Sequence, residues 1–305
     1  MFVNNIDLCN PGEVRRLLDS FGLTPKKGYG QNFLINSAIP AKIADTCAGG
    51  STDDDCAVLE IGPGIGAMTR ELGERFSSVV AVEIDRGLIP LLENTLEGAD
   101  NITVINEDFM KLDLKSFIAE HFDGKKISVC ANLPYYITTP ILMKLLEDIT
   151  PCPFENITVM VQTEVADRMC AAAGSSDYGA VTASIAYYGA AKKAFAVAAG
   201  NFYPAPKVTS SVVKIDIYKE TKYPAHDPAL LFDVIKAAFG QRRKTLVNAL
   251  ASSFPHLSKT QLEQIITSLN HRPDIRGEKL NIADFRDIAD AIYEGNAREE
   301  RKGTF

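Results

Sequence analysis

The sequence has few of the residues that build metal and redox sites. Its six cysteines are scattered over 305 residues, without a Cys-x-x-Cys pair and without the spacing of zinc ligands. We therefore expect reduced cysteines and no bound metal ion. The histidines lie away from the ends of the predicted strands, where an α/β fold keeps its ligand-binding groups. There are four of them, His121, His226, His256 and His271.

Long apolar runs and targeting segments are absent as well. No run approaches the roughly 20 apolar residues that a membrane-spanning helix needs. Residues 1–7 lack a basic segment followed by an apolar one, so they predict no signal peptide. We expect a cytoplasmic protein without membrane contact. The sequence also lacks a Gly-x-Ser-x-Gly nucleophile elbow and a Lys-bearing phosphate loop, which argues against the common designs of α/β-hydrolases and NTPases.

The net charge of −7 would ordinarily count against a nucleic acid as partner. The charge is not evenly spread, because residues 222–305 hold 13 Lys and Arg against 11 Asp and Glu. Basic residues also cluster at Lys26-Lys27 and at Arg242-Arg243-Lys244. We expect the second cluster to lie on a helix that buries Leu246 and Leu250. Local patches set the field that a nucleic acid meets, so the net charge excludes little.

Predicted strands and helices alternate over the first two thirds of the chain. The first four strands are nearly continuous apolar runs, as in a parallel sheet that helices cover on both faces. The predicted strands span residues 57–61, 79–84, 102–105, 127–131, 157–162, 192–197 and 212–218. The predicted helices span residues 11–21, 67–75, 88–96, 140–147 and 164–173.

This alternation predicts an α/β fold with a doubly wound, mostly parallel, Rossmann-like sheet of seven strands. No helix separates the last two predicted strands, so we expect them to form an antiparallel pair at the sheet edge. Beyond residue 220 the pattern turns to helices only. We therefore expect a larger domain over residues 1–220, with an N-terminal helix and loop in residues 1–36. A smaller all-helical domain would follow over residues 221–305.

A glycine turn follows the first predicted strand of this sheet, in the order Gly62-x-Gly64-x-x-Ala67. Glycines permit a tight turn and a close approach of a ligand to the backbone. The exposed N–H groups at the start of the next helix favour negative charge. The pattern also fits the dinucleotide fingerprint, which allows Ala at its last position, so the turn alone leaves the ligand open.

Acidic residues at the strand ends narrow the choice of ligand. Glu83 ends the second predicted strand, where a carboxylate can accept both ribose hydroxyls of an adenosine. Asp108 follows the third strand, where a carboxylate can accept from an adenine amino group. Glu60 stands just before the glycines and suits a cationic ligand better than a pyrophosphate. The set favours S-adenosylmethionine, a sulfonium, over NAD.

The segment Asn132-Leu133-Pro134-Tyr135 follows the fourth predicted strand, at the same edge of the sheet. An exocyclic amine of adenine is a weak nucleophile because its lone pair is delocalised into the ring. The side-chain oxygen of Asn132 and the backbone carbonyl of Leu133 can accept its hydrogens and stabilise the developing positive charge. Tyr135 offers a ring face on which an extruded base can stack. Methyl transfer needs mainly the positioning of two reactants, so no charged base is required.

Four motifs stand in order along the chain: Lys27-Gly28-Tyr29-Gly30-Gln31-Asn32-Phe33-Leu34, Glu60-Ile61-Gly62-Pro63-Gly64, Asn132-Leu133-Pro134-Tyr135 and Gln241-Arg242-Arg243-Lys244. Together they resemble the rRNA adenine dimethyltransferases, the rRNA adenine N(6)-methyltransferase family. The likeness covers residues 26–292 and is strongest to the bacterial branch that acts on 16S rRNA of the small subunit. Thr163 departs from the family, which commonly has Lys at that position.

The resemblance implies a class I methyltransferase fold for the larger domain, with S-adenosylmethionine as methyl donor. It implies dimethylation of two adjacent adenosines, in a hairpin near the 3′ end of 16S rRNA, during biogenesis of the small ribosomal subunit. The helical domain would help to dock that subunit, and a monomer suffices. The cofactor ligands that it implies are Asn32, Leu34, Gly62, Gly64, Glu83, Asp108 and Asn132.

The resemblance also implies how the RNA is held. The target adenine would lie against Asn132 and Tyr135, in the segment that includes Leu133 and Pro134, with Phe202 stacked on its opposite face. The basic residues expected to meet RNA are Lys27, Lys207, Arg242, Arg243 and Lys244.

Alternative functions remain open at this point. A dimethyltransferase of large-subunit rRNA, of the antibiotic-resistance type, shares the same core motifs, although Arg276-x-Glu278-x-Leu280 favours the small-subunit branch. An NAD-dependent oxidoreductase rests on the glycine turn alone. A non-enzymatic role, in which the protein binds the immature subunit as an assembly checkpoint, can coexist with methyl transfer.

Overall fold

The computed structural model describes residues 6–50, 55–122, 124–149 and 152–302. The chain divides into two compact units. The first comprises Met1–Ala166 and Ala190–Ile217, and the second comprises Asp167–Gly189 and Tyr218–Phe305. The first unit holds the large sheet, and the second is built from helices.

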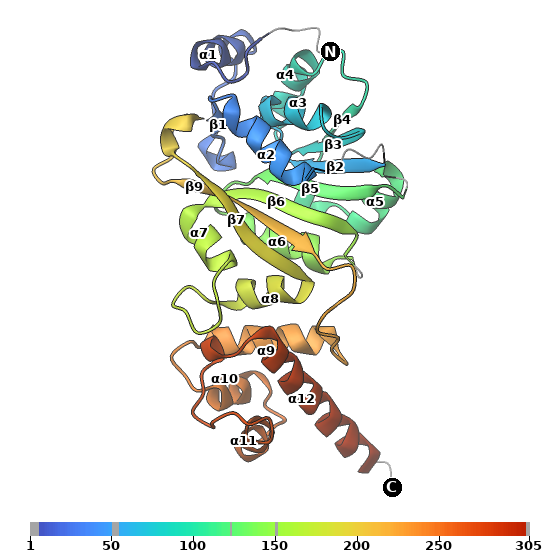
Figure 1. Ribbon diagram of the computed structural model, residues 1–305, viewed down its shortest axis with the longest axis vertical. Helices are drawn as coiled ribbons and strands as arrows, with labels where there is room; N and C mark the ends of the chain where they lie inside the picture. Colours follow the sequence, from blue (N-terminus) through green and yellow to red (C-terminus); the bar gives the residue numbers. More distant parts are fainter. Residues whose placement is uncertain (1–5, 51–54, 123, 150–151, 303–305) are drawn as a thin grey trace. The chain divides into compact units, whose positions relative to one another are not determined.

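The sheet has seven strands in the order β4-β3-β2-β5-β6-β9-β7 (Figure 1). From β4 to β6 all neighbours run parallel, and β9 is antiparallel to β6. The doubly wound, mostly parallel sheet predicted from the sequence is confirmed, with β9 and β7 at its edge. The strands are β2 (Cys56–Ile61), β3 (Ser78–Glu83), β4 (Ile102–Asn106), β5 (Lys126–Asn132), β6 (Phe154–Gln162), β7 (Gly189–Val197) and β9 (Ser210–Ile217).

Helices cover both faces of the sheet because the chain winds in two directions from its centre. From β2 to β4 the strands progress one way, and from β4 through β5 to β6 they progress the other way. Right-handed crossovers therefore place α3 (Ala67–Gly73) and α4 (Ile89–Thr95) on one face and α5 (Leu114–His121) and α6 (Thr138–Glu147) on the opposite face. The switch between the two directions lies at β2 and β5, where such sheets bind ligands.

The core under α3 is also covered by α2 (Ala38–Ala48), a helix that the sequence analysis did not predict. Ile43 and Cys47 of α2 and Leu72 of α3 are fully buried on the apolar residues of β2 and β3. Replacement of a side chain such as Leu72 by Ala would cost about 3 kcal/mol of stability. Every residue of β2 is buried, as its continuous apolar run predicted.

The N-terminal helix α1 (Pro11–Ser20) begins where the sequence predicted it. The side chain of Asn10 accepts hydrogen bonds from the backbone N–H groups of Gly12 and Glu13, and Pro11 fills the first helical position. The helix buries one face in an apolar cluster with α4. The residues on that face are Val14, Leu17 and Leu18.

A two-stranded ladder joins the N-terminal segment to a distant part of the first unit. Strand β1 (Phe33–Leu34) pairs antiparallel with β8 (Phe202–Tyr203), with Phe33 opposite Tyr203. The sequence analysis treated residues 26–36 as a loop, because strands of two residues are too short to show a pattern. The ladder fixes this segment against β8. Short 3-10 turns complete the unit: η1 (Lys27–Tyr29), η2 (Arg86–Leu88), η3 (Phe109–Lys111) and η4 (Ala199–Asn201).

The second unit has one apolar core of its own, to which residues before 190 contribute. Tyr178, Ala183 and Tyr187 are buried in the same cluster as Leu231 and Phe285. A single boundary near residue 220 therefore does not separate the two units, because residues 167–189 pack with the C-terminal helices. The elements are α8 (Ala180–Tyr188), α9 (Pro228–Gly240), α10 (Leu246–Ser253), α11 (Lys259–Ser268), η5 (Gly277–Lys279) and α12 (Ile282–Lys302), and α7 (Thr163–Met169) spans the division.

The basic cluster Arg242-Arg243-Lys244 lies in a turn between α9 and α10, so its predicted place on a helix is wrong. Helix α9 ends at Gly240, and the backbone N–H of Lys244 donates to the carbonyl of Gln241, which closes the turn. Thr245 then starts α10 as its N-cap, with its side chain accepting from the N–H of Asn248. In the described ranges, no helix has the length and apolar character needed to cross a bilayer.

Candidate active site

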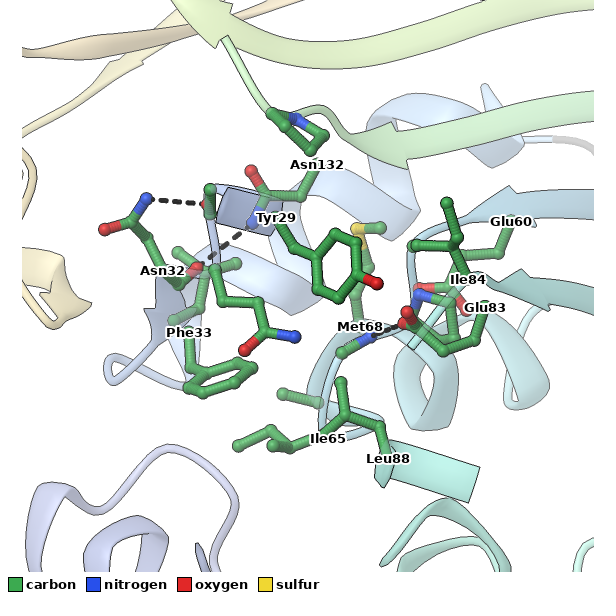
Figure 2. A pocket seen from close by; sticks show the side chains of 18 residues that line it. Tyr29, Asn32, Phe33, Glu60, Ile65, Met68, Glu83, Ile84, Leu88 and Asn132 are labelled. Carbon is green, nitrogen blue, oxygen red and sulfur yellow. Dashed lines mark hydrogen bonds between the residues drawn. The ribbon is translucent and has the colours of Figure 1, made fainter. Parts of the chain in front are cut away.

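A pocket lies at the carboxyl edge of the parallel strands in the first unit (Figure 2). The glycine turn after β2, the ends of β3 and β5, and residues 29–34 of the N-terminal segment line it. Of the residues implied as cofactor ligands, all but one line this pocket: Asn32, Leu34, Gly62, Gly64, Glu83 and Asn132. The structure thus brings together groups from four separate parts of the sequence at the switch point of the sheet.

The glycine turn lets the backbone come close to both the N-terminal segment and a ligand. Gly64 has φ of +62°, in the left-handed region that side chains rarely adopt. A Cβ at this position would lie 3.3 Å from the ring of Phe33, closer than an ordinary contact. The backbone N–H of Gly64 donates to the Glu83 carboxylate at 3.3 Å. The turn therefore needs glycine for its conformation and for the space around it.

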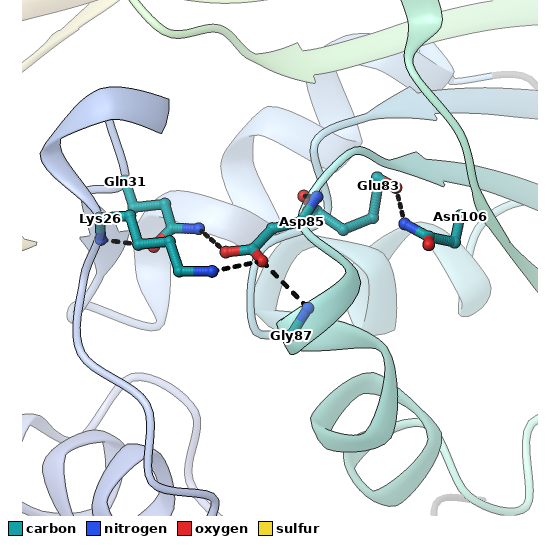
Figure 3. A network of polar contacts seen from close by, with 6 residues as sticks. All are labelled: Lys26, Gln31, Glu83, Asp85, Gly87 and Asn106. Atoms are coloured by element: carbon teal, nitrogen blue, oxygen red, sulfur yellow. Dashed lines mark hydrogen bonds and ion pairs between the residues drawn. The ribbon is translucent and has the colours of Figure 1, made fainter.

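Glu83 is held at the end of β3 with its carboxylate at the pocket wall. Only 4 % of the residue is exposed, and burial raises the pKa of its carboxyl group. One carboxylate oxygen accepts from the N–H of Asp85 at 2.7 Å, and the other accepts from the N–H of Gly64. The side chain of Asn106 donates to the Glu83 carbonyl at 2.7 Å, which fixes the end of the strand (Figure 3). The carboxylate is thereby oriented to accept further hydrogen bonds.

Glu60 is the most unusual group in the pocket lining. It is fully buried, and neither of its carboxylate oxygens has a hydrogen-bond partner among the described residues. Burial, with a smaller contribution from the nearby Glu83 carboxylate, raises the pKa of Glu60 to about 8. An acid buried without a partner keeps its proton near neutral pH and becomes a carboxylate only where a cation stabilises the charge. The geometry therefore fits a ligand that brings positive charge into this end of the pocket.

A second hollow, beside the first, contains Asp108. The two hollows share Tyr29, Gly62, Ile84 and Pro134 as lining residues. The Asp108 carboxylate accepts from the N–H of Met110 at 3.0 Å, and its neighbours in the lining are largely apolar. Glu107 also lines this hollow, and a largely apolar slot with carboxylates at its edge suits a flat heteroaromatic ring that carries an amino group. Asp108 thus lies next to the other implied ligands, although it does not line the same hollow.

Asn132 ends β5 and points its side chain toward the N-terminal segment (Figure 2). Its side-chain nitrogen donates to the backbone oxygen of Asn32 at 3.3 Å. The Asn32 side chain in turn donates to the carbonyl of Gly30 at 2.9 Å. No donor in the described part of the chain occupies the side-chain oxygen of Asn132. The amide is therefore oriented with an acceptor that remains available.

The other residues predicted to hold the target base differ in whether they line the pocket. The Tyr135 hydroxyl shares a hydrogen bond of 2.9 Å with the hydroxyl of Ser210. Leu133 is 2 % exposed, and its N–H donates to the carbonyl of Met160. Pro134 lines both hollows. Phe202 is 3 % exposed and lies in the apolar core with Leu34, so it offers no open face on which a base could stack in this conformation.

The predicted RNA-binding residues differ in exposure and in whether their side chains already make hydrogen bonds within the protein. Lys207, Arg243 and Lys244 are exposed. Arg242 is exposed too, but its guanidinium donates to the carbonyls of Ser176 and Tyr178 at 2.9 and 3.1 Å. The side chain of Lys27 lies outside the described residues. In the described ranges, no group of His, Cys, Asp and Glu residues has the arrangement of a metal site.

Several lining residues were not assigned a role by the sequence analysis. Tyr29, Ile65, Met68 and Leu88 line the pocket with the predicted ligands. Tyr29 belongs to one of the four motifs, but the other three are ordinary apolar residues of helices and turns, and nothing in the sequence distinguishes them from core residues. Asp85, which contacts both the pocket wall and the N-terminal segment, was also missed.

The switch-point pocket, the glycine turn and the acidic strand ends define a Rossmann-like methyltransferase. Residues 22–292 match the family model described as ribosomal RNA adenine dimethylase. The chain belongs to the ribosomal RNA adenine dimethylase family. The predicted activity class, an S-adenosylmethionine-dependent rRNA adenine dimethyltransferase, is thereby confirmed.

Curated relatives and solved structures agree with this family. A Geobacillus protein named "Ribosomal RNA small subunit methyltransferase A" is 42 % identical over 94 % of this chain and 98 % of its own length. A protein of the same name from Shouchella clausii is 44 % identical over 95 % of this chain and 97 % of its own.

Among solved structures, a dimethyladenosine transferase from Plasmodium falciparum superimposes with a TM-score of 0.71 at 25 % identity, covering 87 % of this chain and 98 % of its own. The 23S rRNA methyltransferase ErmE gives a TM-score of 0.63 at 23 % identity, covering 86 % of this chain and all of its own, which supports the fold alone.

Proposed function

We propose that this protein dimethylates the exocyclic amines of two adjacent adenosines in a hairpin near the 3′ end of 16S rRNA, within the small ribosomal subunit. The support for the substrate comes from full-length relatives that are more than 40 % identical and carry the small-subunit name. The observation that carries the chemistry is the oriented side chain of Asn132, whose free oxygen lies beside a pocket suited to a cationic adenosine derivative.

The residues present fit S-adenosylmethionine, which would supply a methyl group on a positively charged sulfur. Glu60 would release its proton and meet the positive charge of the ligand, since its buried carboxyl group lacks a partner among the described residues. Glu83 would accept the ribose hydroxyls, and Asp108 would accept from the adenine amino group. The backbone around Gly62 and Gly64 and the residues Asn32 and Leu34 would enclose the remainder of the ligand.

The groups of this chain act on the target amine by position and by hydrogen bonding. The side-chain oxygen of Asn132 would accept a hydrogen bond from one N–H of the amine, and the carbonyl of Leu133 would accept a hydrogen bond from the other. These two hydrogen bonds increase the electron density on the nitrogen and stabilise the positive charge that develops on it during methyl transfer. Pro134 restricts the turn. Stacking by Tyr135 and Phe202 stays a prediction, and for Phe202 it requires a conformation other than the buried one described here.

Binding of the ribosomal subunit is assigned to the basic residues on the surface. Arg243 and Lys244 are exposed in the turn between α9 and α10, and Lys207 is exposed in the first unit. Arg242 and Lys27 complete the proposed set. We further propose that the protein acts in the cytoplasm, as a monomer, during assembly of the small subunit.

Labelled methyl transfer tests the proposal. Small subunits from a strain that lacks this modification, and naked large-subunit rRNA, would each be incubated with the protein and labelled S-adenosylmethionine. We expect label in the small subunits, recovered as N6,N6-dimethyladenosine after digestion. Label in the large-subunit RNA alone would instead support the antibiotic-resistance type of activity. Binding of NAD without binding of S-adenosylmethionine would overturn both methyltransferase activities, on small-subunit and on large-subunit rRNA.

A further inference from the structure

The N-terminal segment of residues 26–34 supplies one wall of the pocket through residues 29–34. Gly30 adopts φ of +60°, and a Cβ there would lie 3.0 Å from Pro134. The segment therefore packs closely on the turn that holds Asn132. A ligand bound in this pocket would lie against the wall, so movement of the segment would uncover it. The contacts that hold the segment in place thus bear on how long a ligand stays bound.

Asp85 joins this segment to the end of β3 (Figure 3). Its carboxylate accepts from the ammonium group of Lys26 at 2.7 Å and from the side-chain nitrogen of Gln31 at 2.8 Å. Gln31 also accepts from the backbone N–H of Lys26 at 2.7 Å, which closes a ring of contacts. Asp85 is only 4 % exposed, whereas the Lys26 side chain is 47 % exposed. The anion is therefore fixed, and the cation reaches it from the solvent side.

The same residue also holds the pocket wall on its other side. The backbone N–H of Asp85 donates to the Glu83 carboxylate at 2.7 Å. Although burial opposes it, the hydrogen bonds from Lys26 and Gln31 lower the pKa of Asp85, so its carboxylate stays charged near neutral pH. Asp85 thus connects the proposed ribose-binding carboxylate, through its backbone, to the N-terminal wall, through its side chain.

We infer that Asp85 is a positioning residue that closes residues 26–34 over the cofactor pocket through Lys26 and Gln31, and that breaking these contacts sets the rate at which the bound cofactor leaves. The inference rests on the proposed function, since it takes the pocket to be the S-adenosylmethionine site. It goes beyond that function because Asp85 and Lys26 do not line the pocket.

Asp85 also has a local structural role, which must be separated from its proposed hold on residues 26–34. Its carboxylate also accepts from the N–H of Gly87 at 3.0 Å and so caps η2. Replacement by Ala would remove both roles together. Asp85→Asn keeps an oxygen for the cap and removes the charge that attracts Lys26. Lys26→Met leaves the cap untouched and removes the ion pair from the opposite side.

The experiment measures binding of S-adenosylhomocysteine by calorimetry and its dissociation rate by stopped flow. We expect Lys26→Met and Asp85→Asn each to bind it about fivefold more weakly, through faster dissociation. The double variant should lose no more than either single one, because both remove the same ion pair. In methyl transfer, the KM for S-adenosylmethionine should rise while kcat holds.

A second readout needs no ligand. Trypsin cleaves after Lys26 and Lys27 only when the segment opens locally. Asp85→Asn should be cleaved there faster than the wild-type protein, with the same thermal midpoint. Lys192→Met serves as the matched control, since it removes an exposed ion pair with Asp216, at 3.1 Å, that is not at the pocket. The control should bind S-adenosylhomocysteine as the wild type does.

The two possible failures are distinguishable. If the wild-type protein binds S-adenosylhomocysteine and Lys26→Met binds it equally well and releases it equally fast, Asp85 only caps η2 and the inference is wrong. If the wild-type protein itself does not bind S-adenosylhomocysteine, the assignment of the pocket fails, and the proposed function fails with it.

Discussion

The side chain of Asn132 donates to the backbone oxygen of Asn32 at 3.3 Å, although 100 residues separate them in the sequence. An amide side chain can turn either its oxygen or its nitrogen toward a given neighbour. Because a carbonyl oxygen can only accept, the contact with Asn32 commits the nitrogen of Asn132. The oxygen is thereby presented as the acceptor, which is the orientation that an amine substrate requires.

Replacement of Asn132 tests this orientation directly. Asn132→Ala removes the acceptor, and we expect the rate of methyl transfer to small subunits to fall by about 10²-fold or more. Binding of the subunit, measured by co-sedimentation, should remain. Asn36→Ala is the matched control, since it removes an exposed hydrogen bond to Asn201 and leaves the pocket lining intact. Normal turnover in Asn132→Ala would contradict the acceptor role.

The buried carboxylate of Glu60 predicts an unusual dependence of stability on pH. The ordinary pKa of 4.5 applies to the unfolded chain, whereas burial raises the pKa of Glu60 to about 8 in the folded protein. The folded protein therefore keeps a proton that the unfolded chain releases. The stability linked to this proton is fully present below about pH 4.5 and is lost as the pH rises through about 8.

Comparison with Glu60→Gln isolates this contribution. As the pH rises from about 4.5 to about 8, the free energy of unfolding of the wild-type protein should fall relative to that of Glu60→Gln, by on the order of a few kcal/mol. Urea denaturation of both proteins at a series of pH values measures it. If the two stability curves run parallel, Glu60 does not titrate as its burial requires.

Replacement of Gly64 should lower both the stability of the protein and its affinity for the cofactor, and the two effects can be measured separately. Gly64→Ala places a side chain at φ of +62° and brings its Cβ to 3.3 Å from the Phe33 ring. We expect a loss of stability of about 1–2 kcal/mol and weaker binding of S-adenosylhomocysteine. Gly50→Ala is the control for strain alone, since Gly50 has φ of +82° with no atom within 4 Å of an added Cβ. Its loss of stability should be smaller, with binding unchanged.

The two adjacent arginines in the basic turn should behave differently. Arg242 is committed to the carbonyls of Ser176 and Tyr178, so Arg242→Ala should lower the thermal midpoint by a few degrees. Arg243 is exposed. Arg243→Ala should leave the midpoint unchanged, weaken binding of the small subunit, and reduce the slope of log affinity against log salt by about one. Binding that is unaffected by Arg243→Ala, over a range of salt, would contradict a phosphate contact.

The sheet could be predicted from the sequence because its central strands β2, β3 and β5 are buried on both faces. The central strand β2 is apolar at five of its six positions, and such a run admits few other structures. Helices α2, α5 and α8 were missed. Helix α2 has Pro40 near its start, polar residues interrupt the apolar ones of α5, and α8 is rich in Val, Thr, Ile and Tyr, which favour strands. The two-residue strands β1 and β8 have no pattern at all, since only their partner across the fold defines them.

The part of the candidate site that could be predicted from the sequence consists of residues in motifs at the ends of strands. Glu83, Asn132 and Gly64 were found in this way, because a parallel sheet gathers the carboxyl ends of its strands. The role of Asp85 could not be found from the sequence, since an acid two residues beyond a strand is ordinarily solvated. Its significance comes from Lys26 and Gln31, which only the fold brings to it.

The ladder between β1 and β8 has a consequence for synthesis of the protein. Phe33 finds its partner Tyr203 only after two thirds of the chain has been made. Pairing over so long a stretch of chain is slow, because the intervening loop must close before the contact stabilises anything. The nascent chain can therefore form its early strands and helices in succession, while the wall that residues 29–34 give to the pocket is completed late. The pocket of this rRNA dimethylase family member thus takes its final shape only after most of the chain has been translated.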